Sequence, residues 1–154
     1  MKHGLNTVES IELPFIICNS SSFCLYRSRD EMIFWKNYFS WYEDSKVIDN
    51  KLREYRLVKF RSLGGVGWLR GYRWVGGWIN QHVRFDLELE FERELTAKEV
   101  ERIFEKMATR QEEFGPSRVK LFRHDLAAGN FSRLQDFCAL FDKHLQEADS
   151  DADE

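Results

Sequence analysis

Strict alternation between residues 83 and 92 constrains the fold of this chain more than any other feature of its sequence. Apolar and polar residues alternate at every position of this range. The apolar positions are Val83, Phe85, Leu87, Leu89 and Phe91, and the polar positions are Arg84, Asp86, Glu88, Glu90 and Glu92. Because successive side chains of a β-strand point to opposite faces, the alternation predicts a half-buried strand over 78–92 with one wet face.

Two consecutive glycines, Gly76 and Gly77, precede this strand and predict a tight hairpin with residues 68–75 as its first arm. Two-residue hairpin loops favour glycine because both central positions can need a positive φ. A turn at these glycines fixes the register of the two arms. The predicted cross-strand pairs are Trp74–Ile79, Tyr72–Gln81, Arg70–Val83 and Trp68–Phe85.

The other elements complete an α+β chain. Ser28 with Glu31 and Thr96 with Glu99 have the spacing of capping boxes, which predict helix starts. The expected helices cover 28–42, 97–114 and 131–147, and the further expected strands cover 10–18, 54–61 and 117–123. This order predicts a ferredoxin-like (split βαβ) plait, an antiparallel sheet with helices on one face, plus a C-terminal helix.

Length and composition fit one domain. The chain has 154 residues, of which 43% are hydrophobic, enough for a core without disulfides or a structural metal. We predict a single α+β domain over 1–147 and a disordered acidic tail over 148–154. Cys18, Cys24 and Cys138 make an odd count, and neither a leader nor an 18-residue apolar run is found. These features predict free thiols, a cytoplasmic location and no membrane partner.

Charge is unevenly distributed, although the net charge is only −3. Residues 53–84 carry seven basic residues and one acidic residue, a net charge of +6. Residues 86–105 carry eight acidic and three basic residues, a net charge of −5. Carboxylates at alternate positions of one strand lie about 7 Å apart. The acidic face is interpreted either as a solvated strand face or as a landing surface that steers a basic partner.

Tryptophan, tyrosine and arginine gather at the predicted hairpin, and these residue types are enriched at binding hot spots. The alternative is a hairpin that only packs against its own domain. The candidate partner-binding residues are Arg70, Tyr72, Arg73, Trp74, Trp78, Arg84, Asp86, Glu88, Glu90 and Glu92. The pattern favours a non-catalytic protein-binding inhibitor, by analogy with immunity proteins, antitoxins or phage-encoded blockers of host defence. Its partner would be a basic toxin or defence effector, and a homodimer stays open.

Two other function classes remain as alternatives. The basic, tryptophan-rich hairpin fits a module that binds single-stranded nucleic acid, although the four neighbouring carboxylates would repel phosphate. For an enzyme, the candidate residues are His82, His124 and Asp125, and a histidine–aspartate dipeptide is weak evidence of catalysis. No phosphate loop, dinucleotide fingerprint or nucleophile elbow is found. We therefore predict no catalytic residue, no metal and no cofactor.

Overall fold

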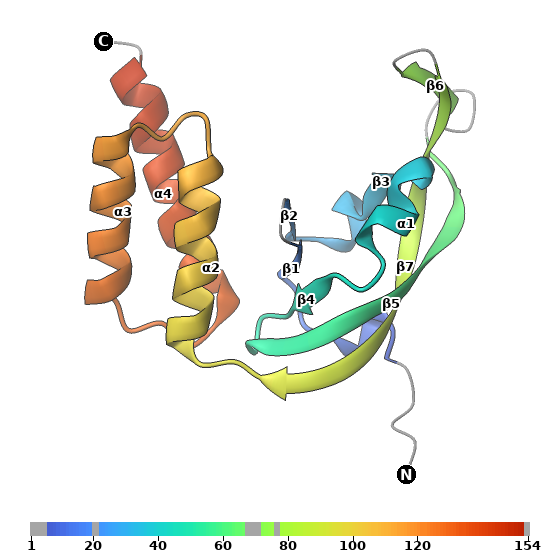
Figure 1. Ribbon diagram of the computed structural model, residues 1–154, viewed down its shortest axis with the longest axis horizontal. Helices are drawn as coiled ribbons and strands as arrows, with labels where there is room; N and C mark the ends of the chain where they lie inside the picture. The colour runs from blue at the N-terminus through green and yellow to red at the C-terminus, as the bar shows by residue number, and fades with distance from the viewer. Residues whose placement is uncertain (1–5, 20–21, 67–71, 76–77, 153–154) are drawn as a thin grey trace. The chain divides into compact units, whose positions relative to one another are not determined.

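The computed structural model of this chain describes residues 6–19, 22–66, 72–75 and 78–152, with the backbone alone at 37, 72–75, 78–80 and 151–152. The chain divides into two compact units (Figure 1). The sheet unit comprises Met1–Asp49 and Arg53–Arg93, and the helical unit comprises Asn50–Leu52 and Glu94–Glu154. Strands and helices together confirm the α+β class. The single domain over 1–147 stays a prediction.

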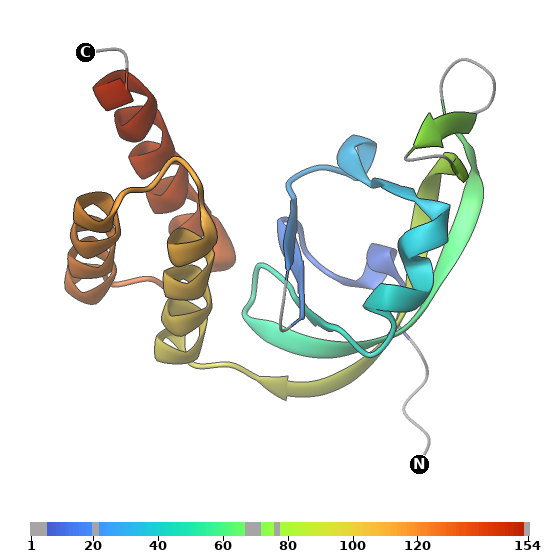
Figure 2. The same cartoon turned by 45° about the horizontal axis from the view of Figure 1, so that its top comes forward.

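In the described part of the sheet unit, six strands follow the order β2-β1-β4-β5-β7-β3, and β6 pairs with β7 beyond that path. The strands are β1 (Phe15–Cys18), β2 (Phe23–Tyr26), β3 (Ile33–Trp35), β4 (Lys46–Ile48), β5 (Arg53–Gly65), β6 (Tyr72–Val75) and β7 (Trp78–Glu94). The two longest, β5 and β7, are strongly curved (Figures 1 and 2). The ferredoxin-like plait is not confirmed, since the sheet has more strands than that fold.

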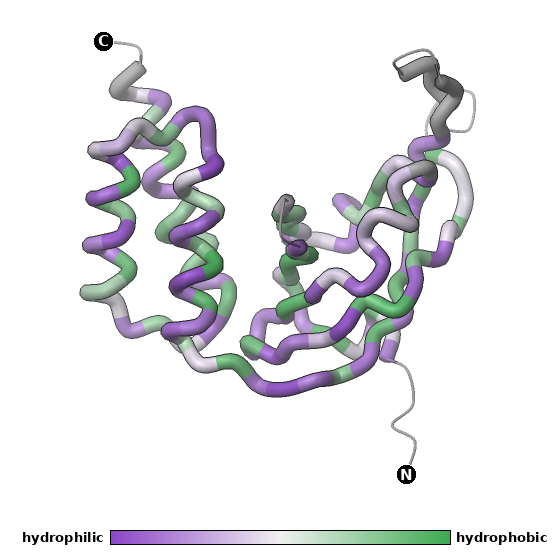
Figure 3. The backbone as a smooth tube through the Cα atoms, in the orientation of Figure 1, coloured by the Kyte–Doolittle hydropathy of each residue, from purple (hydrophilic) through white to green (hydrophobic). Residues whose placement is uncertain are grey.

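The alternation along β7 is confirmed over most of its length. Val83, Phe85, Leu87 and Leu89 are at most 2% exposed. Phe91 departs from the prediction, because it is 44% exposed and lies past the last buried residue of β7 in the core. The tube drawn by hydropathy shows the C-terminal end of β7 as largely hydrophilic (Figure 3).

The predicted hairpin register is confirmed for the described residues. Tyr72 lies opposite Gln81, and Trp74 lies opposite Ile79. The pairs predicted for Arg70 and Trp68 lie outside the described residues. The structure describes only the backbone of Trp74 and Trp78, so it does not report the exposure of their side chains.

The helix predicted over 28–42 is wrong. The segment instead contains a 3₁₀ turn (Arg29–Glu31), strand β3, a second 3₁₀ turn (Lys36–Tyr38) and the one-turn helix α1 (Phe39–Tyr42). The side chain of Ser28 makes no cap, and Glu31 accepts a hydrogen bond from the backbone of Arg27 at 2.9 Å. Aromatic residues favour strands, and the pairing of β3 with β7 outweighs the local helix signal.

Aromatic rings fill the core of the sheet unit. Phe85 makes edge-to-face contacts with Tyr26 and Phe60, at centroid distances of 5.4 Å and 5.2 Å. Phe34 of β3 stacks on Phe60 at 5.8 Å. The segment 28–42 therefore anchors its inner rings in this core, although it is not the predicted helix.

Three helices build the helical unit: α2 (Ala97–Arg110), α3 (Pro116–Ala128) and α4 (Leu134–Ala152). The capping box is confirmed, because the side chains of Thr96 and Glu99 each accept a bond from the other's backbone N–H. All three helices contact one another, as Figures 1 and 2 also show. Their shared core includes Phe104, Phe122, Phe137 and Phe141.

The strand predicted over 117–123 is wrong, because these residues belong to α3. Pro116 occupies the first turn, where its missing N–H costs nothing. Phe122 and Leu126, four residues apart, are buried as one helical stripe. Helix α4 continues to Ala152, and the tail over 148–154 stays a prediction.

No helix among the described residues is long and apolar enough to cross a membrane.

Candidate functional site

The acidic face of β7 is paired with basic side chains from β5 and β4. The ion pairs are Arg56–Glu90 at 2.6 Å, Arg61–Glu88 at 3.8 Å and Lys46–Glu92. Asp86 instead accepts hydrogen bonds from the backbone N–H groups of Leu87 at 2.8 Å and Val8 at 3.3 Å. The acidic face is therefore not a row of unpaired carboxylates.

Further pairs extend this network over β4, β5 and β7. Glu54, whose side chain is 10% exposed, lies 3.6 Å from both Lys46 and Arg93. Asp44 accepts a 2.7 Å hydrogen bond from Arg56. Positive and negative groups thus alternate across the face, and a mixed face of this kind steers a basic partner only weakly.

The Lys46–Glu92 pair gives a testable pH dependence. Its hydrogen bond lowers the pKa of the Glu92 carboxyl and raises the pKa of the Lys46 ammonium group. A lowered pKa means that the stabilisation is present above the unfolded-state pKa of Glu92 and is lost as the pH falls through its folded-state pKa. We expect a double-mutant cycle with Lys46→Gln and Glu92→Gln to give a coupling of about 0.2–1 kcal/mol at neutral pH.

Urea unfolding of the four proteins of the cycle, at neutral pH and at a pH below the folded-state pKa of Glu92, measures this coupling. The coupling should vanish in the acidic series. A coupling of the same size at both pH values would contradict the assignment.

Three aromatic side chains at and after the end of β3 form a partly exposed group, here called the aromatic edge: Trp35, Tyr38 and Trp41. Trp41 is 75% exposed, and Tyr38 meets it edge to face at 5.7 Å. Trp35 stacks on His82 of β7, with ring centroids 4.7 Å apart and planes inclined by 22°. Phe34, Phe39 and Tyr42 of the same segment instead pack against the core.

The aromatic edge adjoins the stretch of β7 from which the hairpin begins. Trp35 lies opposite His82, and the neighbouring Gln81 lies opposite Tyr72 of β6. The strand register therefore brings the aromatic edge next to the hairpin that the sequence selected as a contact arm. The sequence analysis did not select Trp41 as a candidate binding residue.

A small pocket of about 270 Å³ opens beside Trp41. Asn19, Ser22, Trp41 and Tyr42 line it. The hydroxyl of Ser22 lies within hydrogen-bond distance of the Tyr42 hydroxyl, at 3.0 Å, and of Asn19 Oδ1, at 3.2 Å. The exposed indole of Trp41 therefore borders a pocket that also contains the hydrogen-bonded hydroxyl groups of Ser22 and Tyr42 and the amide of Asn19.

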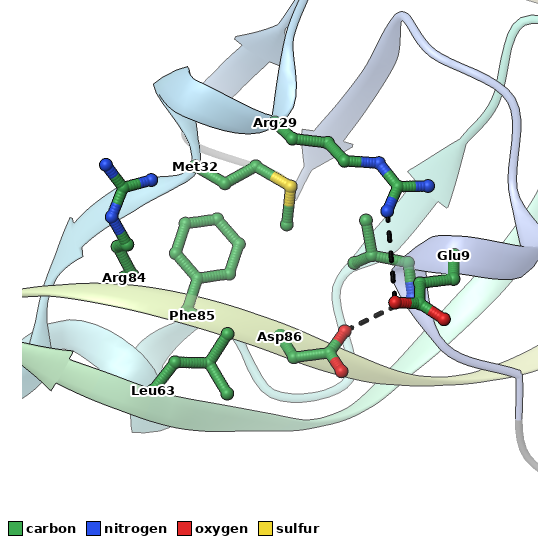
Figure 4. Close-up of a pocket in the computed structure, with 8 residues that line it drawn as sticks. Glu9, Arg29, Met32, Leu63, Arg84, Phe85 and Asp86 are labelled. Atoms are coloured by element: carbon green, nitrogen blue, oxygen red, sulfur yellow. Dashed lines mark hydrogen bonds and ion pairs between the residues drawn. The ribbon is translucent and has the colours of Figure 1, made fainter.

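A second pocket, of about 220 Å³, lies beside β7 (Figure 4). Its apolar wall contains Val8, Met32 and Phe85, each at most 5% exposed, and the exposed Leu63. Its charged rim contains Glu9, Arg29, Arg84 and Asp86. Arg84 and Asp86 were candidate binding residues, and the structure places both at this pocket.

The enzyme candidates belong to different units: His82 to the sheet unit, and His124 and Asp125 to the helical unit. Asp125 pairs with His144 of α4, whose Nε2 lies 2.7 Å from Asp125 Oδ2, whereas the neighbouring His124 is exposed. His144 is 2% exposed, and its Nδ1 lies 3.5 Å from Arg118. His82 stacks on Trp35. This buried histidine contacts two residues of α3 and so joins α3 to α4.

The three cysteines are free thiols, as predicted. Cys18 and Cys138 are buried, and burial raises the pKa of the half-buried Cys24. A protonated thiol is a poor nucleophile. Within the described ranges, no three His, Cys, Asp or Glu side chains gather closely enough to hold a metal ion.

The remaining candidate binding residues are only partly described. Arg70 lies outside the described residues. The structure gives the backbone alone for Tyr72, Arg73, Trp74 and Trp78. Glu88, Glu90 and Glu92 lie on the paired face described above. No family model, curated protein or solved structure matches this chain.

Proposed function

We propose that this protein acts by binding another protein, as a non-catalytic inhibitor of the immunity-protein, antitoxin or anti-defence kind. Its contact surface is the hairpin of β6 and β7 together with the aromatic edge. The same proposal places it in the cytoplasm, in agreement with its free thiols.

The exposure of Trp41 carries the proposal. An indole is the largest apolar side chain, and leaving 75% of it in water forgoes a substantial hydrophobic gain. Tryptophan that stands beside tyrosine is typical of the anchors that dominate binding free energies. The pocket next to Trp41 adds fixed polar groups, which orient a partner that covers the indole.

The revised charge pattern changes the kind of partner expected. Because Arg56, Arg61 and Lys46 neutralise much of the acidic face, affinity is expected from the aromatic rings rather than from long-range attraction. Association should then depend weakly on salt, in contrast with a complex steered by an exposed row of carboxylates.

Substitution of Trp41 by alanine tests the proposal. We expect Trp41→Ala to weaken partner binding by about 2 kcal/mol or more, roughly thirtyfold, because the indole is a central anchor. Quantitative pull-down from lysates of a natural host or its competitors identifies the partner, and calorimetry with the purified pair measures the loss. Trp74→Ala tests the hairpin in the same assay.

Leu121→Ala is the matched control, because Leu121 is also an exposed apolar residue, at 52%, but belongs to the helical unit. The proposal requires binding that Leu121→Ala leaves intact and that Trp41→Ala reduces. Equal affinity of all three variants would place the contact surface elsewhere. The double variant Glu88→Lys/Glu90→Lys reports separately on the contribution of the paired face.

Binding of single-stranded nucleic acid is the second candidate. The flat stack of Trp35 on His82 and the exposed Trp41 are the kind of platform on which bases stack. The pairing of the carboxylates also removes part of the repulsion expected for phosphate. Quenching of tryptophan fluorescence by short oligonucleotides, weakening steeply with salt, would favour this candidate over protein binding.

A further inference from the structure

The pocket beside β7 has an apolar wall and, at its rim, Arg84, which forms no ion pair with a carboxylate of the described residues. Met32 and Phe85 form the centre of the wall and are 5% and 2% exposed. Figure 4 shows Arg84 and Arg29 on opposite sides of these two side chains. Leu63, 62% exposed, completes the wall from β5.

The four charges at the rim are not equivalent. Asp86 already accepts two backbone N–H bonds, from Leu87 and Val8, which disperse its charge. Arg29 and Glu9 are mostly exposed and lie 3.9 Å apart, the separation of a weak surface pair. Arg84 is exposed and has no ion-pair partner among the described residues. The most available charge at this rim is therefore positive.

We propose that this pocket binds a small apolar carboxylic acid, with its hydrocarbon part against Met32 and Phe85 and its carboxylate on Arg84. A volume of about 220 Å³ suits a ligand with a single ring or a short chain. Arginine recognises carboxylates through paired N–H donors, and an apolar wall contributes affinity by excluding water. The site shares no residue with the aromatic edge, but Arg84 and Asp86 belong to β7, which also forms the hairpin.

Methionine methyl NMR provides a reporter inside the pocket. The chain contains three methionines, and Met107 lies in the helical unit, where it serves as an internal reference. We expect 3-phenylpropionate to shift the Met32 methyl signal saturably and to leave Met107 unchanged. Met32→Leu assigns the signal. Acetate, which lacks the apolar part, and 3-phenylpropan-1-ol, which lacks the charge, should bind at least about tenfold more weakly.

Two substitutions test the charge assignment in opposite directions. Arg84→Gln should weaken 3-phenylpropionate binding about tenfold, because it removes a charge-assisted hydrogen bond. Glu9→Gln should tighten it about two- to fivefold, because it removes from the rim a negative charge that repels the ligand's carboxylate. Lys59→Gln, which removes an exposed cation elsewhere on β5, is the matched control and should have no effect.

A gain of affinity in Glu9→Gln cannot result from misfolding. The opposite effects of Glu9→Gln and Arg84→Gln therefore distinguish a change in binding from a loss of folded protein. The proposal is overturned if the Met32 signal does not respond to the acid. It is also overturned if the alcohol binds as tightly as the acid, or if Arg84→Gln and Lys59→Gln behave alike.

Discussion

Truncation of Phe85 to alanine is expected to destabilise the sheet unit by about 3–5 kcal/mol, whereas Phe91→Ala should cost less than about 1 kcal/mol. Both residues belong to the apolar positions of the same strand. Phe85 is 2% exposed and contacts the rings of Tyr26 and Phe60, so its removal leaves a cavity in a packed core. Phe91 is 44% exposed and makes its ring contact with Tyr55 at 5.6 Å.

Urea unfolding followed by tryptophan fluorescence measures the difference. All five tryptophans, at positions 35, 41, 68, 74 and 78, belong to the sheet unit, so the signal reports on that unit. Val83→Ala, at a fully buried position of the same strand, should give an intermediate loss. Equal losses for Phe85→Ala and Phe91→Ala would show that the core continues to the end of β7.

This pair of residues also shows what the sequence determines about β7. Alternation identifies the strand and its two faces, because the period of two belongs to the strand itself. It cannot identify where the core ends, because that depends on which other elements cover the strand. Phe91 continues the apolar–polar alternation but is not buried. The sequence alone does not distinguish it from the buried positions, and the structure does.

The errors over 28–42 and 117–123 have a related physical origin. Ser28 and Glu31 satisfy the local spacing of a capping box, but pairing of Ile33–Trp35 with β7 stabilises an extended backbone instead. In 117–123, Val119 and Leu121 suggested alternation, whereas Phe122 and Leu126 carry the helical period. Where a local pattern is compatible with both the strand period and the helical period, tertiary contacts determine which structure forms. These contacts cannot be read from a single sequence.

The candidate site was predictable only in part. The hairpin register follows from the two glycines, and the structure confirms it between Tyr72 and Gln81. Net charge along the chain did not reveal that Arg56 and Arg61 face the carboxylates of β7, because cross-strand partners depend on the order of the strands. The exposure of Trp41 likewise depends on which rings of 34–42 enter the core.

A second large effect is expected at His144, the buried histidine that joins α3 to α4. Its ring meets Phe122 edge to face at 5.3 Å, and its Nε2 lies 2.7 Å from Asp125 Oδ2. His144→Ala removes both the packing and the hydrogen bond, and we expect it to destabilise the helical unit by about 2–4 kcal/mol. His124→Ala is the matched control on the exposed side of α3 and should cost less than about 0.5 kcal/mol.

Far-UV circular dichroism during urea unfolding follows the helices and therefore reports on this unit. His144→Gln separates the two contributions, because a glutamine amide can still donate to Asp125 while the ring contact with Phe122 is lost. We expect its stability to lie between those of the wild type and His144→Ala. If His144→Ala were as stable as His124→Ala, the histidine would not be a structural link. Its contacts with Asp125 and Arg118 would then contribute little to the stability of the helical unit.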